Sequence, residues 1–320
     1  MKKVAIGIDI GGTNTVMGIV DQDGNVVSES SIPTRTHPDY TIYLDALTEA
    51  VNKMLEPVSG EGEVVGMGLG APNGNYYNGT IEFAPNLKFK GVVPVVEYLR
   101  KKFDFPHIIL TNDANAAAIG EMIYGGATGM KDFIMITLGT GVGSGIVVNG
   151  EMVYGHDGFA GEIGHTIVDP NGRDCGCGRK GCLETYTSAP GIKRTVFELL
   201  ATMTEPSELR DISFNELSAK RIDQAARSGD VIALEAFDYT GEVLALKLAD
   251  AIAHTSPEAI FLFGGLANAG ELIFEPVRQY LEESVLNIYK NKVKVLPSKL
   301  PASDAAVLGA SALVWKEIAK

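Results

Sequence analysis

The chain has 320 residues, of which 45% are hydrophobic, and its formal net charge is −13. A chain of this length usually folds as two domains or two similar halves. The acidic balance, without any basic tail or basic run, argues against nucleic acid or an anionic membrane surface as a general partner. No apolar run reaches 18 residues, and Asp9 ends the N-terminal run. We therefore expect neither a transmembrane helix nor a signal peptide, and we expect a cytoplasmic protein.

The first third of the chain predicts an α/β unit that opens with a hairpin. The predicted hairpin has a strand over 4–10, a glycine-rich turn over 11–15 and a returning strand over 16–20. The other predicted elements are, in chain order, a helix over 43–55, a strand over 64–69, a helix over 93–102, a strand over 108–110 and an alanine-rich helix over 114–124.

A second unit repeats the opening hairpin. A strand over 133–138, a glycine-rich turn over 139–145 and a strand over 146–148 are followed by Asn149-Gly150, a type I′ turn signal. Residues 6–11 align with residues 134–139, which gives an internal repeat of about 128 residues and predicts two similar α/β halves. The remaining chain is mostly helical, with a late strand over 259–263.

Two glycine-rich turns on duplicated hairpins favour a phosphate clamp, because each turn can present several backbone N–H groups to an anion. The chain has neither the G-x-x-x-x-G-K-[ST] loop nor a G-x-G-x-x-G turn that opens a helix. For either turn taken alone, an ordinary tight hairpin turn remains the alternative. Asp9 ends the first strand beside its turn, where a carboxylate can hold Mg²⁺ or can simply cap the turn.

Asp113 lies between a buried strand and the start of a helix. On the residues alone, Asn112 or Asp113 is best explained as the N-cap of that helix. The alternative is a catalytic base, whose ionised form the helix N-terminus would favour.

All three cysteines of the chain fall within the eight residues CGCGRKGC, as Cys175, Cys177 and Cys182. A cytosolic chain does not normally keep structural disulfides, and no C-x-x-C redox pair is present. With His165, which precedes the cluster, the three thiols make a Cys₃His set that is typical of structural zinc. Unligated thiols in a loop are the alternative.

Three segments together resemble the actin-like ATPase superfamily, and in particular its ROK (repressor, open reading frame, kinase) branch. They are DIGGTN with LGTGVG, then TNDANAAA, then a histidine followed by C-x-C-G-x-x-G-C-x-E. The resemblance runs from Val4 to about Leu313. It implies two actin-like (ribonuclease H-like) α/β domains flanking a cleft, with a zinc-binding loop. We expect a small domain over 1–111 plus 303–320, and a larger domain over 112–302 that carries the zinc motif.

The resemblance also implies a function: ATP-dependent phosphorylation of a hexose, with glucose converted to glucose 6-phosphate as the first expectation. Fructose, mannose, allose, N-acetylmannosamine and N-acetylglucosamine are alternative substrates. A transcriptional regulator is a weaker alternative, because the first phosphate loop begins at Asp9 and leaves no room before it for a DNA-binding domain. The expected cofactors are ATP, Mg²⁺ and structural Zn²⁺, and a homodimer or homotetramer is expected.

The resemblance assigns roles residue by residue. Asp113 is the expected general base. The expected nucleotide-binding residues are Asp9, Gly11, Gly12, Thr13, Asn14, Gly139, Thr140, Gly141, Gly264 and Gly265. The expected sugar-binding residues are Asn86, Asn112, Asp113, Glu162, His165 and Glu184. The expected zinc ligands are His165, Cys175, Cys177 and Cys182. Two residues depart from the family pattern, since Asn73 and Ser144 stand where the family usually has glycine.

Overall fold

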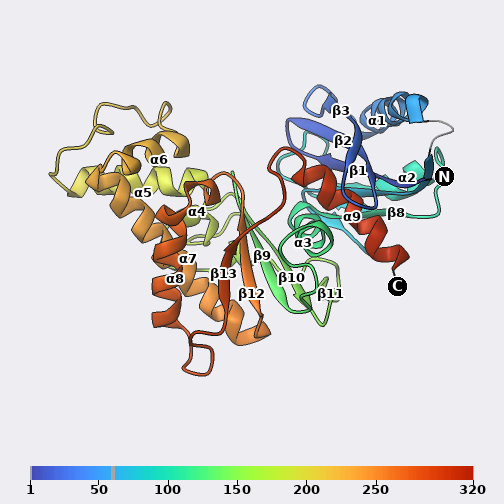
Figure 1. Cartoon of the computed structure of the whole chain (residues 1–320). Helices are drawn as coiled ribbons and strands as arrows, with labels where there is room; N and C mark the ends of the chain where they lie inside the picture. Colours follow the sequence, from blue (N-terminus) through green and yellow to red (C-terminus); the bar gives the residue numbers. More distant parts are fainter. Residues whose placement is uncertain (1, 59–61, 320) are drawn as a thin grey trace.

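Two five-stranded sheets with the same strand order and directions form the frame of the molecule (Figure 1). The structure, a computed structural model, describes residues 2–58 and 62–319. The first sheet has the order β3-β2-β1-β4-β8 and the second has β11-β10-β9-β12-β13. In both sheets three antiparallel strands are joined to two parallel ones. The predicted duplication and the actin-like α/β fold class are confirmed.

The first sheet is built from β1 (Lys2–Ile10), β2 (Asn14–Asp21), β3 (Val26–Pro33), β4 (Gly62–Ala71) and β8 (Ile108–Asn112). Its buried face packs against α1 (Tyr40–Leu55) and α2 (Val95–Arg100). A small sheet of β5 (Gly74–Asn75), β6 (Thr80–Glu82) and β7 (Val92–Val93) lies beside it, and η1 (Glu56–Val58) follows α1.

Both helices of this part differ from their predicted bounds. The first begins three residues earlier than predicted because the Asp39 side chain caps it, accepting hydrogen bonds from the N–H groups of Thr41 and Ile42. The second was predicted over 93–102 but begins only at Val95, because Pro94 precedes it and Val93 belongs to a strand.

The second sheet is built from β9 (Phe133–Leu138), β10 (Val142–Val148), β11 (Glu151–Met152), β12 (Ala259–Phe263) and β13 (Lys294–Pro297). One face is covered by a helical layer of α4 (Glu184–Thr187), α5 (Ala189–Thr202), α6 (Ala219–Arg227), α7 (Val231–Thr255) and α8 (Glu271–Ser284), with η2 (Ile163–His165) and η3 (Ala267–Ala269). The second glycine turn is shorter than predicted, since β10 already begins at Val142. Asn149 and Gly150 both have positive φ, which confirms the predicted turn.

Two helices join the halves by packing on each other. α3 (Asp113–Tyr124) follows the first sheet but packs on β9 and β10, whereas α9 (Ala305–Ile318) follows the second sheet but packs on β1 and β4. They approach closely where Gly120 meets Gly309, since a Cβ on Gly120 would lie 2.8 Å from the Gly309 Cα. The predicted domain boundaries at 111/112 and 302/303 stay a prediction.

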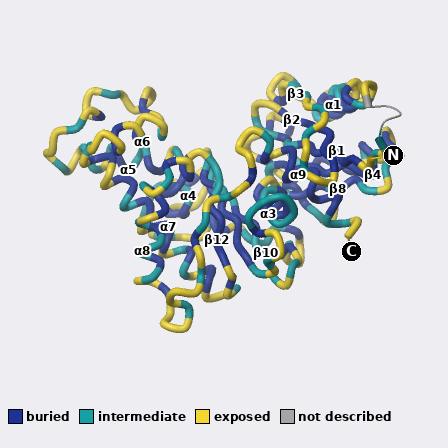
Figure 2. Tube along the Cα trace, viewed as in Figure 1, coloured by how far each residue is buried: buried dark blue, intermediate teal, exposed yellow. Residues whose placement is uncertain are grey.

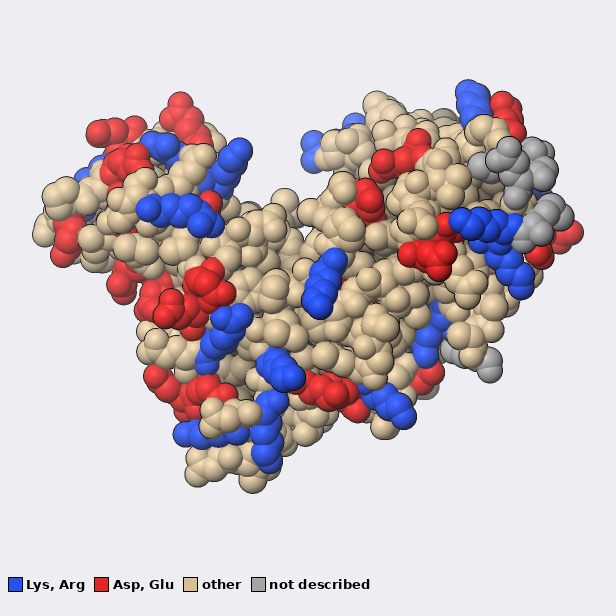
Figure 3. Space-filling model, in the orientation of Figure 1, with Lys and Arg blue, Asp and Glu red and all other residues tan. Residues whose placement is uncertain are grey.

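The buried residues form separate cores in the two lobes (Figure 2). In space-filling view the surface is hollowed between these lobes (Figure 3). Across the described ranges, no helix combines the length and apolar character needed to span a bilayer. The predicted cytoplasmic location stays a prediction.

Candidate active site

Two aspartates meet where the parallel strands of the first sheet end. Asp9 on β1 is in register with Gly70 on β4, which is in register with Thr111 on β8, two residues before Asp113. A Cβ on Gly70 would lie 3.6 Å from the Asp9 Oδ1 and 3.6 Å from the Asp113 Cα. The carboxyl ends of parallel strands commonly form ligand sites. Here the glycine leaves room between two acids from distant parts of the chain.

Both aspartates hold their protons more tightly than usual. Burial, together with the charge of Asp113, raises the pKa of Asp9 to about 7. Burial also raises the pKa of Asp113, against the opposing hydrogen bond from the Ala114 N–H. Asp113 nevertheless keeps contact with solvent. The two properties are compatible where protein surrounds a side chain on several sides and leaves another side open to water.

The structure separates the two roles that the sequence left open for Asn112 and Asp113. The Asn112 side chain caps α3, since its Oδ1 accepts a hydrogen bond of 2.7 Å from the Asn115 N–H. Asp113 is the first residue of the helix, and its Oδ1 accepts a bond of 2.9 Å from the N–H of Ala114. The cap is therefore supplied by Asn112, which leaves Asp113 available for a role in the cleft.

The first glycine turn is a tight connection backed by a predicted sugar-binding residue. The Gly11 N–H donates to the Asn14 C=O at 3.0 Å, which closes the turn between β1 and β2. A Cβ on Gly12 would lie 2.9 Å from the Asn86 C=O. The turn and the loop that carries Asn86 therefore touch.

The second glycine turn contacts another predicted sugar-binding residue. The Gly139 N–H donates to the Gly141 C=O at 3.0 Å, so that Thr140 forms the exposed tip. The carboxylate of Glu184 accepts a hydrogen bond of 3.0 Å from the Val142 N–H. A Cβ on Gly141 would overlap the Glu184 Oε2, so that the carboxylate would have to move. Glu184 therefore holds the second turn from the side.

A third turn adjoins the second one. Gly264 has a φ of +104°, and a Cβ on it would lie 2.6 Å from the Leu138 C=O. The N–H of Leu266 donates to the same C=O at 3.2 Å. The Gly264-Gly265 turn thus lies against the end of β9, directly before the second glycine turn.

The predicted metal ligands gather at one point. The ligand atoms of His165, Cys175, Cys177 and Cys182 all lie within 4.8 Å of one another. The Cys175 Sγ is 3.8 Å from the His165 Nδ1, and the Cys177 Sγ is 3.6 Å from the Cys182 Sγ. Burial opposes ionisation of the Cys177 thiol, but hydrogen bonds from Arg179 and the other thiols outweigh it and lower the pKa of Cys177 to about 6. Three thiols and one imidazole in this arrangement fit a tetrahedral zinc ion.

Glu162 faces the other charged groups of the site. Burial raises its pKa, the charges of Asp113 and Glu184 raise it further, and His165 lowers it. Glu162 itself keeps solvent contact, as Asp113 does. The structure therefore brings Glu162 within electrostatic range of Asp113, which lies far from it in the sequence, and of Glu184 and His165.

The two departures from the family pattern have structural explanations. Asn73 has a φ of 51°, in the region that favours glycine, and its Nδ2 donates to the Glu82 C=O at 2.9 Å. Asparagine tolerates this conformation better than most side chains. Ser144 is buried, and its hydroxyl bonds to the segment around Glu162.

Arg35 is a residue at the site that the sequence analysis did not single out. Its Nε donates to the Gly12 C=O at 3.3 Å, and its N–H donates to the Thr13 C=O at 3.3 Å. A guanidinium therefore lies beside the first glycine turn. No spacing in the sequence points to it, because only the pairing of β2 with β3 brings it there.

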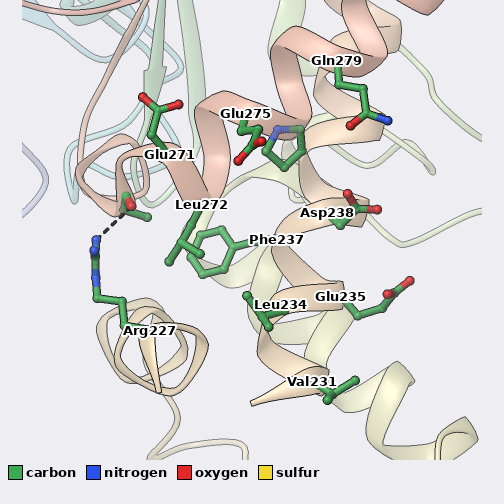
Figure 4. A pocket seen from close by; sticks show the side chains of 12 residues that line it. Arg227, Val231, Leu234, Glu235, Phe237, Asp238, Glu271, Leu272, Glu275 and Gln279 are labelled. Atoms are coloured by element: carbon green, nitrogen blue, oxygen red, sulfur yellow. Dashed lines mark hydrogen bonds between the residues drawn. The ribbon is translucent and has the colours of Figure 1, made fainter. Parts of the chain in front are cut away.

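A pocket of about 530 Å³ lies elsewhere, among α6, α7, η3 and α8 (Figure 4). Leu234, Phe237 and Leu272 line it together with acidic side chains, and Arg227 donates to the Ala269 C=O at 2.9 Å. None of the predicted site residues lines this pocket. The candidate site is instead the open cleft at the strand ends.

Comparisons with known proteins agree with this geometry. The model of the ROK family matches residues 5–317. The chain belongs to the ROK family. A glucokinase of Halalkalibacterium halodurans is 34% identical over 316 residues, which cover 98% of this chain and 95% of that protein. A xylose repressor of Caldicellulosiruptor bescii is 30% identical over 318 residues, covering 98% of this chain and 78% of the repressor.

A solved structure of similar fold comes from the same family. It is a ROK family glucokinase from Streptomyces griseus in complex with glucose and AMPPNP, with a TM-score of 0.79 and 33% identity. The match covers 97% of this chain and 98% of that one.

Proposed function

We propose that this ROK family chain is an ATP-dependent sugar kinase that converts glucose to glucose 6-phosphate. The observation that carries the proposal is the meeting of Asp9 and Asp113 across Gly70, where β1 and β4 end and the first glycine turn begins. The full-length similarity to glucokinases supports it. A regulator is less favoured, because the repressor is 30% identical to this chain and the glucokinase is 34% identical.

Asp113 is the general base in this proposal. Its carboxylate would accept the proton of the 6-hydroxyl group while that oxygen forms a bond to the γ-phosphorus and the bond from phosphorus to the β-bridging oxygen of ATP breaks. Phosphoryl transfer depends mainly on positioning and charge neutralisation, so that a modest base is sufficient. A raised pKa suits the role, because a base whose pKa lies nearer neutral pH accepts a proton more readily in the transition state.

The glycine turns would bind the nucleotide through backbone N–H groups. We assign the phosphates to residues 11–14 and 139–141, and the adenosine side to Gly264 and Gly265. Asp9 would bind Mg²⁺, directly or through water, since a carboxylate oxygen is a preferred ligand. When bound, Mg²⁺ neutralises phosphate charge. Arg35 would add positive charge beside the first turn.

The sugar would be gripped by the polar groups that surround Asp113. We assign this role to Asn86, Asn112, Glu162, His165 and Glu184, because carboxylates and amides can each pair with two neighbouring hydroxyl groups. The zinc set would act structurally, since all four ligands come from the protein and no position is left for water. The His165 Nδ1 faces the thiols, so that Nε2 could reach the sugar.

A panel of sugars tests the proposal. The purified protein is incubated with ATP, Mg²⁺ and each of glucose, mannose, fructose, allose, N-acetylmannosamine and N-acetylglucosamine, and ADP release is measured. Glucose is expected to give the highest kcat/KM. A higher value for another sugar would replace glucose by that sugar, and no turnover on any of them would contradict the kinase itself. Gel filtration with light scattering tests the expected homodimer or homotetramer.

A further inference from the structure

Glu162 occupies the centre of a three-residue turn. Its backbone φ and ψ are −75° and 55°, and the Ile163 N–H donates to the Gly161 C=O at 2.8 Å. These are the features of an inverse γ-turn. The turn has a single internal hydrogen bond, so that other groups must hold it if the Glu162 side chain is to keep one direction.

The hydroxyl group of Ser144 contacts both ends of this turn. Ser144 lies on β10, where it is 3% exposed. Its Oγ donates a hydrogen bond to the Gly161 C=O and accepts one of 3.1 Å from the Ile163 N–H. The peptide groups before and after Glu162 are therefore fixed by the same buried side chain.

The next segment lies directly against the same strand. A Cβ on Gly164 would overlap the Val142 C=O, so that the backbone passes β10 without any intervening side chain. The close approach places the turn within reach of a short side chain such as serine. Ser144 also stands where the family usually has glycine, which has no hydroxyl group to offer.

The charges of the site explain why the turn needs support. Glu162 interacts unfavourably with the carboxylates of Asp113 and Glu184, and favourably with His165. Like charges at short range repel each other, and the open side of Glu162 faces water. Without a restraint, the Glu162 carboxylate would reduce this electrostatic repulsion by turning away from the other acids and into the solvent.

We propose that Ser144 is a positioning residue that holds Glu162 in the sugar site by locking the γ-turn around it. Ser144 acts through Glu162 and contacts neither sugar nor nucleotide. The inference rests on the proposed function, and in particular on the role of Glu162 in sugar binding. The inference predicts that the protein with Ser144 binds the sugar more tightly than a variant with glycine at this position.

A double-mutant cycle with Ser144→Ala and Glu162→Gln tests this inference. Steady-state kinetics with the best sugar of the panel are measured for the wild type, both single variants and the double variant. Ser144→Ala is expected to raise the sugar KM on the order of tenfold, because small misplacements of a binding group are costly, and to leave the ATP KM unchanged. In the Glu162→Gln background the same change is expected to have less than about a twofold effect, because residues that act through one another are not additive.

Ser311→Ala serves as the matched control, because it also removes a buried hydroxyl group that bonds to a backbone C=O. It is expected to alter thermal stability at most and to leave both KM values unchanged. If Ser144→Ala does not fold, Ser144→Gly carries the same test with the residue usual in the family.

Two results would overturn the inference. One is an unchanged sugar KM in a folded Ser144 variant, and the other is an equal loss with and without the Glu162 carboxylate. In either case the kinase function would stand, since the wild type turns sugar over. Absence of turnover on every hexose would instead overturn the proposed function, and this inference with it.

Discussion

The two halves of the molecule share a backbone plan but end their first strands differently. Asp9 is the last residue but one of β1, and the aligned residue, which is the last but one of β9, is Thr137. The Asp9 carboxylate faces Asp113 across Gly70 and has a raised pKa. The Thr137 hydroxyl accepts a hydrogen bond of 3.2 Å from the Gly143 N–H of its own hairpin. One repeat thus offers an acid to the cleft, and the other offers only backbone groups.

The halves also differ in the segments inserted after their hairpins. Between β3 and β4 the first half inserts little more than α1, whereas residues 153–258 of the second half hold the metal-ligand cluster and helices α4 to α7. This insertion also supplies Glu162, His165 and Glu184. The two halves therefore share one frame. They differ in single side chains and in one insertion, which carries three of the residues that we propose for sugar binding.

The largest effect is expected from Asp113, the acid that Asp9 faces across Gly70. Asp113→Asn should retain sugar binding but lower kcat by at least about 10²-fold, because proton acceptance by a positioned base typically contributes ~10² to 10⁴ in rate. Binding is measured by calorimetry and turnover by ADP release. Asp104→Asn, at an exposed aspartate that precedes β8, is the control. Near-normal turnover in folded Asp113→Asn would reject Asp113 as the base.

The insertion of the second half is tested by removing one metal ligand. Cys177→Ala should lose zinc and raise the sugar KM by about tenfold or more, because the metal would tie Glu162 and His165 on one side to Glu184 on the other. Zinc is measured by elemental analysis. Lys180→Ala, at an exposed residue of the same loop, should keep both zinc and KM. A zinc-free variant with unchanged sugar affinity would show that the insertion does not couple metal to sugar.

Asp9 and Thr137 occupy aligned positions of the two repeats, but only Asp9 should make the free energy of unfolding depend on pH. The pKa of Asp9 is about 7 in the folded protein and near its usual 3.8 in the unfolded chain. The folded state therefore holds this proton more tightly, and the stability that it contributes is lost as the pH rises through about 7.

Urea unfolding of the protein without nucleotide or Mg²⁺, at about pH 5 and about pH 8, measures this effect. Asp9→Asn should reduce the loss of unfolding free energy between these two pH values. Thr137→Val, which removes no titratable group, should keep the wild-type dependence. If the unfolding free energy of Asp9→Asn changes between the two pH values as much as that of the wild type, another residue holds the proton.

The smallest effect concerns the far end of the first hairpin. Asp21 is 2% exposed and accepts hydrogen bonds from the Asp23 and Asn25 N–H groups at 3.0 and 2.9 Å, and from the Lys2 Nζ at 3.0 Å. Burial opposes its ionisation, but the bonds from Asn25 and Lys2 outweigh burial and lower the pKa of Asp21 to about 2.

Asp21→Asn should therefore lower the unfolding free energy by about 1–2 kcal/mol at neutral pH without altering kcat. Because the pKa of Asp21 is depressed in the folded state, the stabilisation is present above its unfolded value and is lost as the pH falls towards about 2. Asp23→Asn, at an exposed neighbour, is the control. A loss of turnover in Asp21→Asn would show that this end of the hairpin also affects the cleft.

Local patterns in the sequence were sufficient to predict the frame of the molecule. The hairpins and their repetition follow from the pattern of apolar residues and glycine-rich turns, and the Asn149-Gly150 turn follows from two residues that tolerate positive φ. The metal-ligand cluster could also be predicted from the sequence, because its three thiols lie within one short loop. Helix bounds were less accurate, since α1 begins after the cap at Asp39 and α2 begins only after Pro94, which the apolar pattern does not indicate.

Which distant residues meet depends on the tertiary structure. Sheet register places Asp9 opposite Gly70 and therefore near Asp113. The start of α4 lies against β10, where the Glu184 carboxylate accepts a hydrogen bond from the Val142 N–H. The bond of Ser144 to the turn around Glu162 is of the same kind. Such contacts join segments far apart in the chain, and they depend on strand order, register and close backbone approach. Periodicity describes only neighbours within one element, so it predicted the frame of this protein, and packing determined its site.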